Sequence, residues 1–215
     1  MTRPRTRVVG RPYAKVDAAD KVAGRTRFAD DILLPRMLHC KLLRSTRAHA
    51  RIVSVDTSRA EKLPGVFAVA TGRDLPIPFG ILPVSQDEHA LCLDRVRYVG
   101  DPVAAVAALD EDAALAAVNA IDVVYEGLPP IGSIEEAVTT PEPRIHDYGD
   151  AGNFHKLVAM EFGSTEEGFA RADRVFDDLF FYEGSTHLPL EQHASVADFG
   201  PDGKVTLWSS TQTPH

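Results

Sequence analysis

Residues 99–130 read VGDPVAAVAALDEDAALAAVNAIDVVYEGLPP, and this stretch decides the fold class. The small and β-branched residues from Pro102 to Leu109 predict a buried strand. Asp110 is placed to cap a helix from Glu111 to Ala120, and Ile121 to Glu126 predicts a second strand. The stretch therefore predicts an α/β (α+β) fold in which an alanine-rich helix packs closely against a sheet.

Further strands and helix starts are predicted on both sides of this unit. Serines followed three residues later by a glutamate predict capping boxes at Ser58, Ser133 and Ser164. Gly200-Pro201-Asp202-Gly203 predicts the turn of a hairpin. The other predicted strands are Met37–Leu43, Arg51–Asp56, Val66–Ala70, Leu157–Phe162, Val175–Tyr182, Ala194–Phe199 and Val205–Ser209.

The composition is typical of one large or two smaller globular domains. Of the 215 residues, 44% are hydrophobic and 25% are charged. The longest apolar run, Pro102 to Leu109, is far shorter than the roughly 20 residues of a membrane span, so we expect no membrane contact. Four arginines near the N-terminus have no apolar segment behind them, which predicts a solvated arm rather than a secretory signal.

Charge and motifs exclude several classes of function. The formal net charge of -8 disfavours nucleic acid as a partner. Cys40 and Cys92 match no metal or redox spacing and predict two reduced thiols in a cytoplasmic protein. The sequence contains neither a phosphate-binding glycine motif nor a G-x-S-x-G nucleophile motif.

One cluster of candidate metal ligands lies at His187, Glu191 and His193. In a strand all three would face one way, with His187 and Glu191 roughly 13 Å apart and Glu191 and His193 roughly 7 Å apart. The first distance is too long for one ion unless the chain bends at Pro189. The residues favour a structural, hydrogen-bonded role, and a small metal-dependent enzyme using Glu191 and His193 is a third hypothesis.

The last residues, VTLWSSTQTPH at 205–215, predict a strand that delivers Gln212 to its tip. A neutral amide there can donate and accept hydrogen bonds without adding charge. From these residues alone, a solvent-facing loop residue is the favoured interpretation, and a ligand contact is the alternative.

Several ordered segments resemble the molybdenum-binding large subunit of the xanthine dehydrogenase and aldehyde oxidase family. The resemblance runs from Lys21 to His215, in the order and spacing of the family. The segments are KVAGRTRFADDI (21–32), RSTRAHARIVSVDTSRAEKLPGVFAV (44–69), VRYVGDPVAAVAA (96–108), VVYEGLPPI (123–131), THLPLEQHASVA (186–197) and WSSTQTPH (208–215).

The composition predicts an arm at residues 1–20 and a linker at 131–153. The resemblance implies an α/β hammerhead domain at 21–130. The incomplete start of a molybdenum-cofactor-binding α+β domain follows at 154–215. In the family, a glutamine in the Ser-Thr-Gln segment approaches the metal and hydrogen-bonds an oxo ligand, and Gln212 stands at that position. The resemblance therefore favours a cofactor contact at Gln212. It implies no catalytic residue and no metal ligand within these residues.

The implied function is that of the N-terminal part of a molybdopterin-dependent oxidoreductase subunit, inactive alone. The resemblance implies molybdopterin in its cytosine dinucleotide form, and iron-sulfur clusters and FAD on partner subunits. The implied substrate is an aromatic or heteroaromatic small molecule or a CoA thioester. Residues 75–111 are most similar to the large subunit of 4-hydroxybenzoyl-CoA reductase, so hydroxylation and reductive dehydroxylation both stay open. The alternative is a non-catalytic α/β subunit-interaction module.

Overall fold

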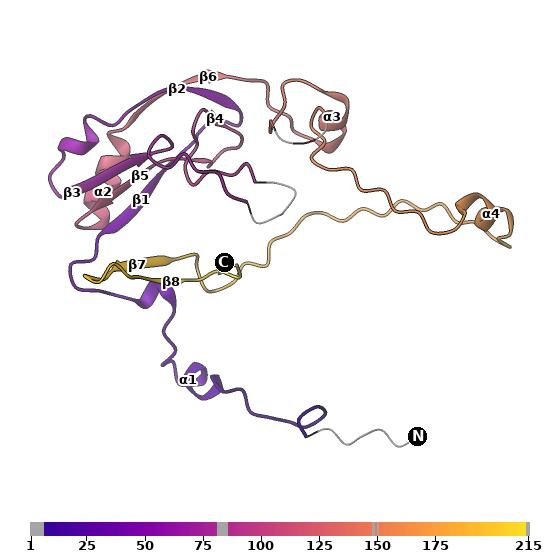
Figure 1. The fold of residues 1–215 in the computed structure, drawn as a ribbon, viewed down its shortest axis with the longest axis horizontal. Coiled ribbons are helices and arrows are strands. Elements are labelled where there is room, and N and C mark those ends of the chain that lie inside the picture. Colours follow the sequence, from indigo (N-terminus) through magenta and orange to yellow (C-terminus); the bar gives the residue numbers. More distant parts are fainter. Residues whose placement is uncertain (1–6, 81–85, 148, 150, 214–215) are drawn as a thin grey trace. The chain divides into compact units, whose positions relative to one another are not determined.

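The computed structural model describes residues 7–80, 86–147, 149 and 151–213 (Figure 1). The chain divides into two compact units, which are described one after the other. The smaller unit combines Met1–Leu34 with Phe181–His215, and the larger unit is Pro35–Phe180. Within the described ranges, no helix has the length and the apolar character needed to cross a membrane.

Two small antiparallel sheets form the larger unit, each with three strands. In the first sheet, β5 (Pro102–Ala108) lies between β1 (His39–Arg44) and β3 (Val66–Thr71). In the second sheet, β2 (Ala50–Asp56) lies between β4 (Arg95–Val96) and β6 (Asp122–Gly127). The strands predicted in these regions are confirmed, with shifts at their ends, whereas the short strand β4 was not predicted.

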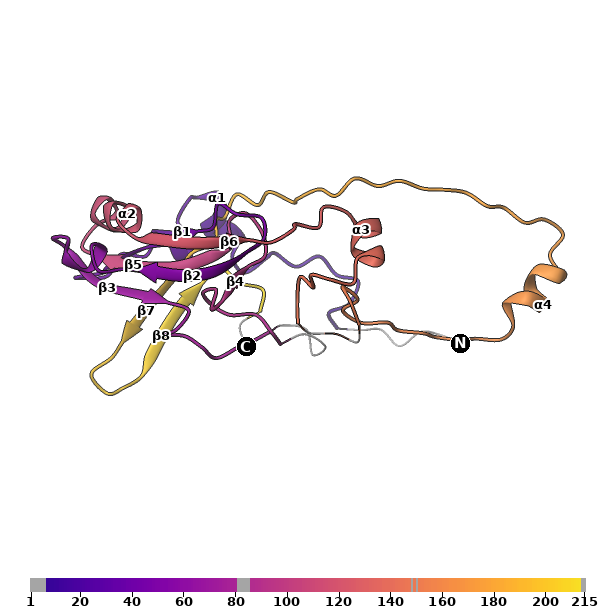
Figure 2. The same ribbon diagram turned by 90° about the horizontal axis from the view of Figure 1, so that it is seen from above.

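Helix α2 (Glu111–Asn119) connects β5 of one sheet to β6 of the other. Asp110 caps it as predicted, because its carboxylate accepts a hydrogen bond from the Ala113 amide at 2.8 Å. Figure 2 shows α2 over one face of the sheet that contains β5. The predicted strand, helix and strand are confirmed, but the two strands belong to different sheets.

Two clusters of buried side chains form the core of the larger unit, and β5 contributes to both. Val106 and Ala104 belong to a cluster with Ala117 of α2. Val103 belongs to the second cluster, with Val96 of β4. Successive residues of a strand point to opposite faces, so β5 packs on both sides. This arrangement explains why its sequence is continuously apolar rather than alternating.

Two of the three predicted capping boxes begin helices. The Ser133 hydroxyl accepts a hydrogen bond at the start of α3 (Ile134–Thr139), and the Ser164 hydroxyl does so at the start of α4 (Thr165–Ala170). The prediction at Ser58 is wrong, because a short 3-10 helix follows with Arg59 at its N-cap.

The reason for the failure at Ser58 is competition from the residues at the end of β2. The carboxylate of Asp56 accepts the Ser58 amide at 3.0 Å, and the Thr57 hydroxyl donates to Glu61. The Ser58 amide and the Glu61 carboxylate, which would bond to each other in a capping box, are therefore already bound to Asp56 and Thr57.

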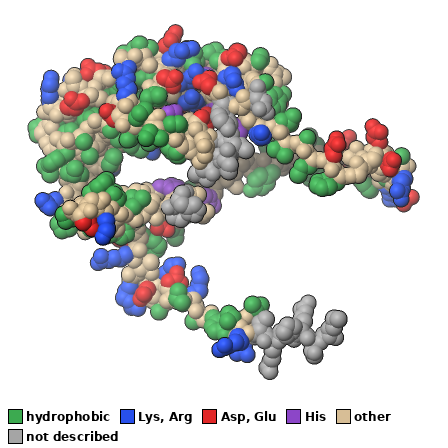
Figure 3. Space-filling view, in the orientation of Figure 1, with side chains coloured by type: hydrophobic (Ala, Val, Ile, Leu, Met, Phe, Trp, Pro, Cys, Tyr) green, Lys and Arg blue, Asp and Glu red, His purple; other side chains and the backbone are tan. Residues whose placement is uncertain are grey.

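The predicted strands Leu157–Phe162 and Val175–Tyr182 are wrong, because both segments lie outside any strand of the described chain. Their side chains are exposed, with Phe162 at 87% and Phe180 at 87%. Hydrophobic side chains are accordingly visible at the surface around α4 in Figure 3. A strand needs a partner for its backbone hydrogen bonds, and the apolar pattern alone does not supply one.

The smaller unit contains the hairpin of β7 (Ser195–Phe199) and β8 (Val205–Ser209), together with α1 (Ala18–Val22) and a 3-10 helix at Ala29–Asp31. The 3-10 helix contacts β7. The predicted hairpin turn is confirmed, since the Gly200 amide donates to the Lys204 carbonyl at 2.8 Å.

We expect Gly72→Ala to destabilise the larger unit, and Gly127→Ala to serve as its matched control. A Cβ at Gly72 would collide with the carbonyl oxygen of Cys92 and lie 2.8 Å from the Cα of Leu93, whereas a Cβ at Gly127 would meet nothing within 4 Å. The free energy of unfolding should fall by about 1–3 kcal/mol for Gly72→Ala and change by less than about 0.5 kcal/mol for Gly127→Ala. Denaturant unfolding followed by circular dichroism measures both, and equal values would contradict the close packing at Gly72.

Candidate functional site

Gln212 lies just beyond the end of β8, as predicted, and its side chain is exposed. Ser210 fixes the backbone before it, because its hydroxyl donates to the carbonyl of Gln192 at 2.9 Å and accepts from the amide of Ala194 at 2.8 Å. In the described part of the chain, no hydrogen bond involves the Gln212 amide group. The side-chain amide of Gln212 is therefore available to an external partner. The hydrogen bonds of Ser210 fix the backbone from which this side chain extends.

The three candidate metal ligands do not come together. His187, Glu191 and His193 are exposed and lie outside any strand, so the alternation that would place them on one face does not apply. Among the residues that the structure describes, no group of three or more His, Cys, Asp or Glu side chains could hold a metal ion. The hypothesis of a small metal-dependent enzyme using Glu191 and His193 gains no support.

A cavity of about 370 Å³ opens in the larger unit, where the segment before β5 meets the residues around His146. No local sequence pattern predicts this cavity, because its walls come from parts of the chain that are distant in sequence. Its lining includes acidic, basic and thiol groups, among them Asp87, Cys92, Arg97 and Asp101.

Asp101 organises one wall of this cavity. It is buried at 8% exposure, and its carboxylate accepts the backbone amide of Arg97 at 2.8 Å. The Cys92 thiol and the Tyr98 hydroxyl both feel the negative charge of this carboxylate. Burial, and then the negative charge of Asp101, raise the pKa of Cys92 to about 12 and also raise the pKa of Tyr98. Both groups are therefore neutral at physiological pH, and Cys92 is not an activated nucleophile.

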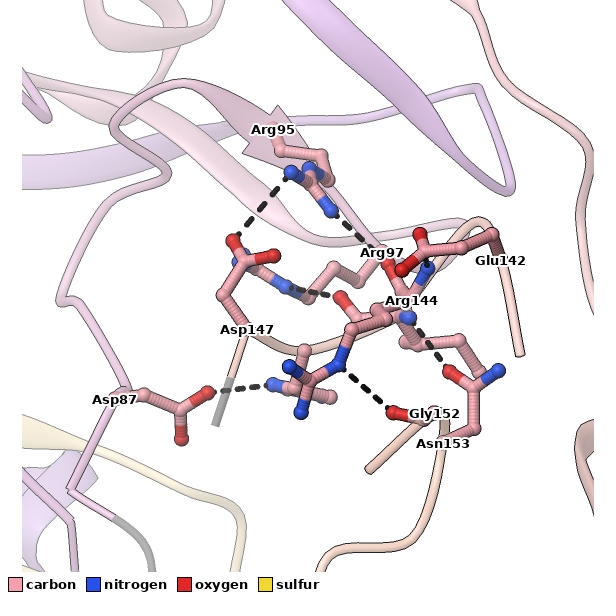
Figure 4. A network of polar contacts seen from close by, with 10 residues as sticks. Asp87, Arg95, Arg97, Glu142, Arg144, Asp147, Gly152 and Asn153 are labelled. Carbon is pink, nitrogen blue, oxygen red and sulfur yellow. Dashed lines mark hydrogen bonds and ion pairs between the residues drawn. The ribbon is translucent and has the colours of Figure 1, made fainter. Parts of the chain in front are cut away.

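The loop that contains His146 also lines the cavity, and polar side chains bind this loop to the residues of β4 and to Arg97. Arg95 donates to the carbonyl of Arg144 at 3.0 Å, and Arg97 donates to the carbonyl of Ile145 at 2.8 Å (Figure 4). His146 Nδ1 lies 2.8 Å from a carboxylate oxygen of Asp87. The cavity thus lies between the segment that precedes β5 and the loop around His146, and it contains no activated thiol.

Comparison with known proteins assigns both parts of the chain. A family model described as "Aldehyde oxidase and xanthine dehydrogenase, a/b hammerhead domain" matches residues 23–129. A model described as "Molybdopterin cofactor-binding domain" matches residues 145–215. The matches identify the two parts of the chain as an α/β hammerhead domain and a region of the molybdopterin cofactor-binding domain type. The chain belongs to the xanthine dehydrogenase and aldehyde oxidase family, which confirms the resemblance seen in the sequence.

Individual relatives cover nearly the whole chain. The nicotinate dehydrogenase large molybdopterin subunit of Eubacterium barkeri is 39% identical over 210 residues, which are 97% of this chain and 48% of the relative. A probable xanthine dehydrogenase subunit of Bacillus subtilis strain 168 is 39% identical over 208 residues, which are 95% of this chain and 27% of the relative. The chain therefore spans about half the length of the first relative and about a quarter of the second.

The fold agrees with a solved structure of the same family. The crystal structure of quinoline 2-oxidoreductase from Pseudomonas putida 86 superposes with a TM-score of 0.82 and 32% sequence identity. The superposition covers 94% of this chain and 27% of that chain.

We expect the two cysteines to differ in their reaction with a thiol reagent at pH 8. Burial raises the pKa of both thiols, but Cys40 is exposed, whereas Cys92 is buried and has a pKa of about 12. Only about 1 in 10⁴ Cys92 thiols is therefore ionised at that pH. In the folded protein, Cys92 should therefore react at least about a hundredfold more slowly than Cys40. Labelling of Cys40→Ser and Cys92→Ser variants, folded and in denaturant, measures each thiol separately. Equal rates in the folded variants would contradict the buried environment of Cys92.

The contact between Asp87 and His146 should depend on pH. Burial raises the pKa of Asp87, but the hydrogen bond and the charge of His146 outweigh it and hold this pKa below the ordinary value of 3.8, with a smaller contribution from Arg97. Because the pKa of Asp87 is lowered, the contact contributes its full stabilisation at pH values above the ordinary pKa of an aspartate carboxyl. This contribution is lost as the pH falls through the lowered pKa. NMR titration of the Asp87 carboxyl should give a higher midpoint in His146→Gln than in the wild type. An unchanged midpoint would show that the contact does not form.

Proposed function

We propose that this chain contributes the hammerhead domain and the first part of the cofactor-binding domain to the molybdopterin-binding subunit of a molybdenum oxidoreductase. One observation carries the proposal: the two family models match in order, at residues 23–129 and 145–215, and a relative is 39% identical over 97% of the chain.

Gln212 is the proposed cofactor contact in this chain. Its exposed amide fits a polar cofactor, because it offers donors and an acceptor without adding charge. The bound molybdopterin supplies two-electron redox chemistry at molybdenum. The role of Gln212 is to donate a hydrogen bond to that group from a backbone position fixed by Ser210 and the β7–β8 hairpin.

The cofactor is proposed to be the cytosine dinucleotide form of molybdopterin. We place the iron-sulfur clusters and FAD on partner subunits in the cytoplasm. The cysteine count supports this division, because the chain has 2 cysteines and a cluster is commonly held by about four thiolates. Two relatives are named for heteroaromatic compounds, nicotinate and quinoline, which supports a heteroaromatic substrate. A CoA thioester and reductive dehydroxylation, as in 4-hydroxybenzoyl-CoA reductase, are the alternative to hydroxylation.

The 215 residues are proposed to be inactive on their own. In the described structure, the candidate cofactor contact is a single exposed side chain, which does not hold a whole pterin. The segments Leu157–Phe162 and Val175–Tyr182 also expose their hydrophobic side chains, as surfaces that dock on another polypeptide do.

That exposed apolar surface also favours a second candidate function, a non-catalytic subunit-interaction module. Molybdenum content distinguishes the two functions. A complete subunit purified from cells that make the cofactor should contain stoichiometric molybdenum by mass spectrometry. A complete subunit without molybdenum would overturn the proposed function and would favour the subunit-interaction module.

Variants of Gln212 in the complete enzyme test the proposed contact. Gln212→Ala removes one hydrogen bond and should lower turnover per molybdenum by about one to two decades, for a loss of about 1–3 kcal/mol felt in the transition state. Gln212→Glu replaces the donor with a negative charge and should be worse. Molybdenum content should stay near that of the wild type in Gln212→Ala.

The matched control is Gln86→Ala, which removes another exposed glutamine side chain. It should leave turnover per molybdenum unchanged. Wild-type turnover in both Gln212 variants would make Gln212 an ordinary loop residue.

A further inference from the structure

Arg95 lies in the short strand β4, and Arg97 follows the last residue of that strand, Val96. Val96 is fully buried in the second cluster, and strand alternation places Arg95 and Arg97 on the opposite side. The pair Ala50 and Val96 joins β4 to β2. The backbone after Val96 is fixed as well, because the Arg97 amide donates to the buried carboxylate of Asp101 at 2.8 Å. Both guanidinium groups therefore start from fixed backbone positions.

Both arginines bind the same short stretch of chain, residues 144–147. One Nη of Arg95 donates to the Arg144 carbonyl at 3.0 Å, and the other lies 3.4 Å from the Asp147 carboxylate. Arg97 donates through Nε to the Ile145 carbonyl at 2.8 Å. The Arg95 side chain is only 13% exposed, whereas the Asp147 side chain is 67% exposed. The contact of Arg95 with the Arg144 carbonyl is therefore better shielded from water than its ion pair with Asp147. Figure 4 shows both arginines pointing at this stretch.

The loop that they hold is braced by its own polar groups. Arg144 donates to the carbonyls of Gly152 at 2.8 Å and Gly149 at 3.2 Å. Asn153 accepts the Ile145 amide at 2.7 Å and donates to the Thr140 carbonyl at 2.7 Å. These bonds tie residues 144 and 145 to residues 140, 149, 152 and 153. The arginines therefore hold a segment that is itself braced by hydrogen bonds.

We propose that Arg95 and Arg97 form a clamp that fixes the chain on the hammerhead sheet at the point where the cofactor-binding part begins. The held residues 144–147 lie at the start of the match to the cofactor-binding model, residue 145. Arg95 and Arg97 are positioning residues, because they act through the loop. The role of the clamp in an enzyme rests on the proposed function. The contacts that form the clamp do not depend on that proposal.

Arginine is suited to this task. A planar guanidinium presents several donors in a fixed fork, so Arg95 can bind a carbonyl and a carboxylate at once. A lysine offers one flexible ammonium group in its place. Replacement of Arg97 by lysine can still supply a single donor to the Ile145 carbonyl, whereas replacement of Arg95 by lysine loses one of two contacts.

Hydrogen exchange of the 215-residue chain tests the clamp without any cofactor. In the double variant Arg95→Ala/Arg97→Ala, the amides of residues 140–153 should exchange about tenfold faster or more, because the loop loses its hydrogen bonds to β4. The amides of β5 and α2 should exchange at the wild-type rate. Arg97→Lys should restore much of the protection lost in Arg97→Ala.

The matched control is Arg59→Ala, which removes an exposed ion pair with Asp122 elsewhere in the same unit. It should leave loop exchange unchanged. Wild-type exchange of residues 140–153 in the double variant would overturn the clamp. Equal acceleration in β5 and α2 would also overturn it, since the arginines would then support the sheet itself. Molybdenum content plays no part in this measurement, so its result is separate from the test of the proposed function.

Discussion

The packing of β5 on both of its faces is the interaction on which the rest of the larger unit depends. Val106 and Val103 point into different clusters, and α2 covers one of them through Ala117. Small side chains allow the helix to approach closely, so the burial of a few valines and alanines is enough to join two sheets. Strand β4 packs against the second cluster through Val96, and the positions of Arg95 and Arg97 follow from that packing.

Local chemistry made much of this fold predictable from the sequence. The Asp110 cap, the Gly200–Gly203 turn and the strands around β5 depend on neighbouring residues, and the structure confirms them. The strands predicted at Leu157–Phe162 and Val175–Tyr182 failed because a strand also needs a partner. The capping box at Ser58 failed because Asp56 already bound its amide.

The two candidate sites differ in how sequence could reveal them. Gln212 carries no chemical signal beyond its residue type, and only resemblance to a family indicates a role, while the structure shows an exposed, available amide. The contacts between the β4 region and residues 144–147 are visible in the structure but are not predicted by the sequence. These contacts join residues separated by about fifty positions in the chain, as in the pair Arg95 and Arg144. No local pattern links such distant partners.

The position of the sheets along the chain has a consequence for synthesis. Every strand of the two three-stranded sheets lies between His39 and Gly127, and α2 lies within the same range. All residues of both hydrophobic clusters are thus synthesised before the residues that match the cofactor-binding model, which begin at 145. Domains generally form as units during translation, from the N-terminal side. The hammerhead can therefore serve as a template that is already in place when the nascent chain delivers residues 144–147 to its edge.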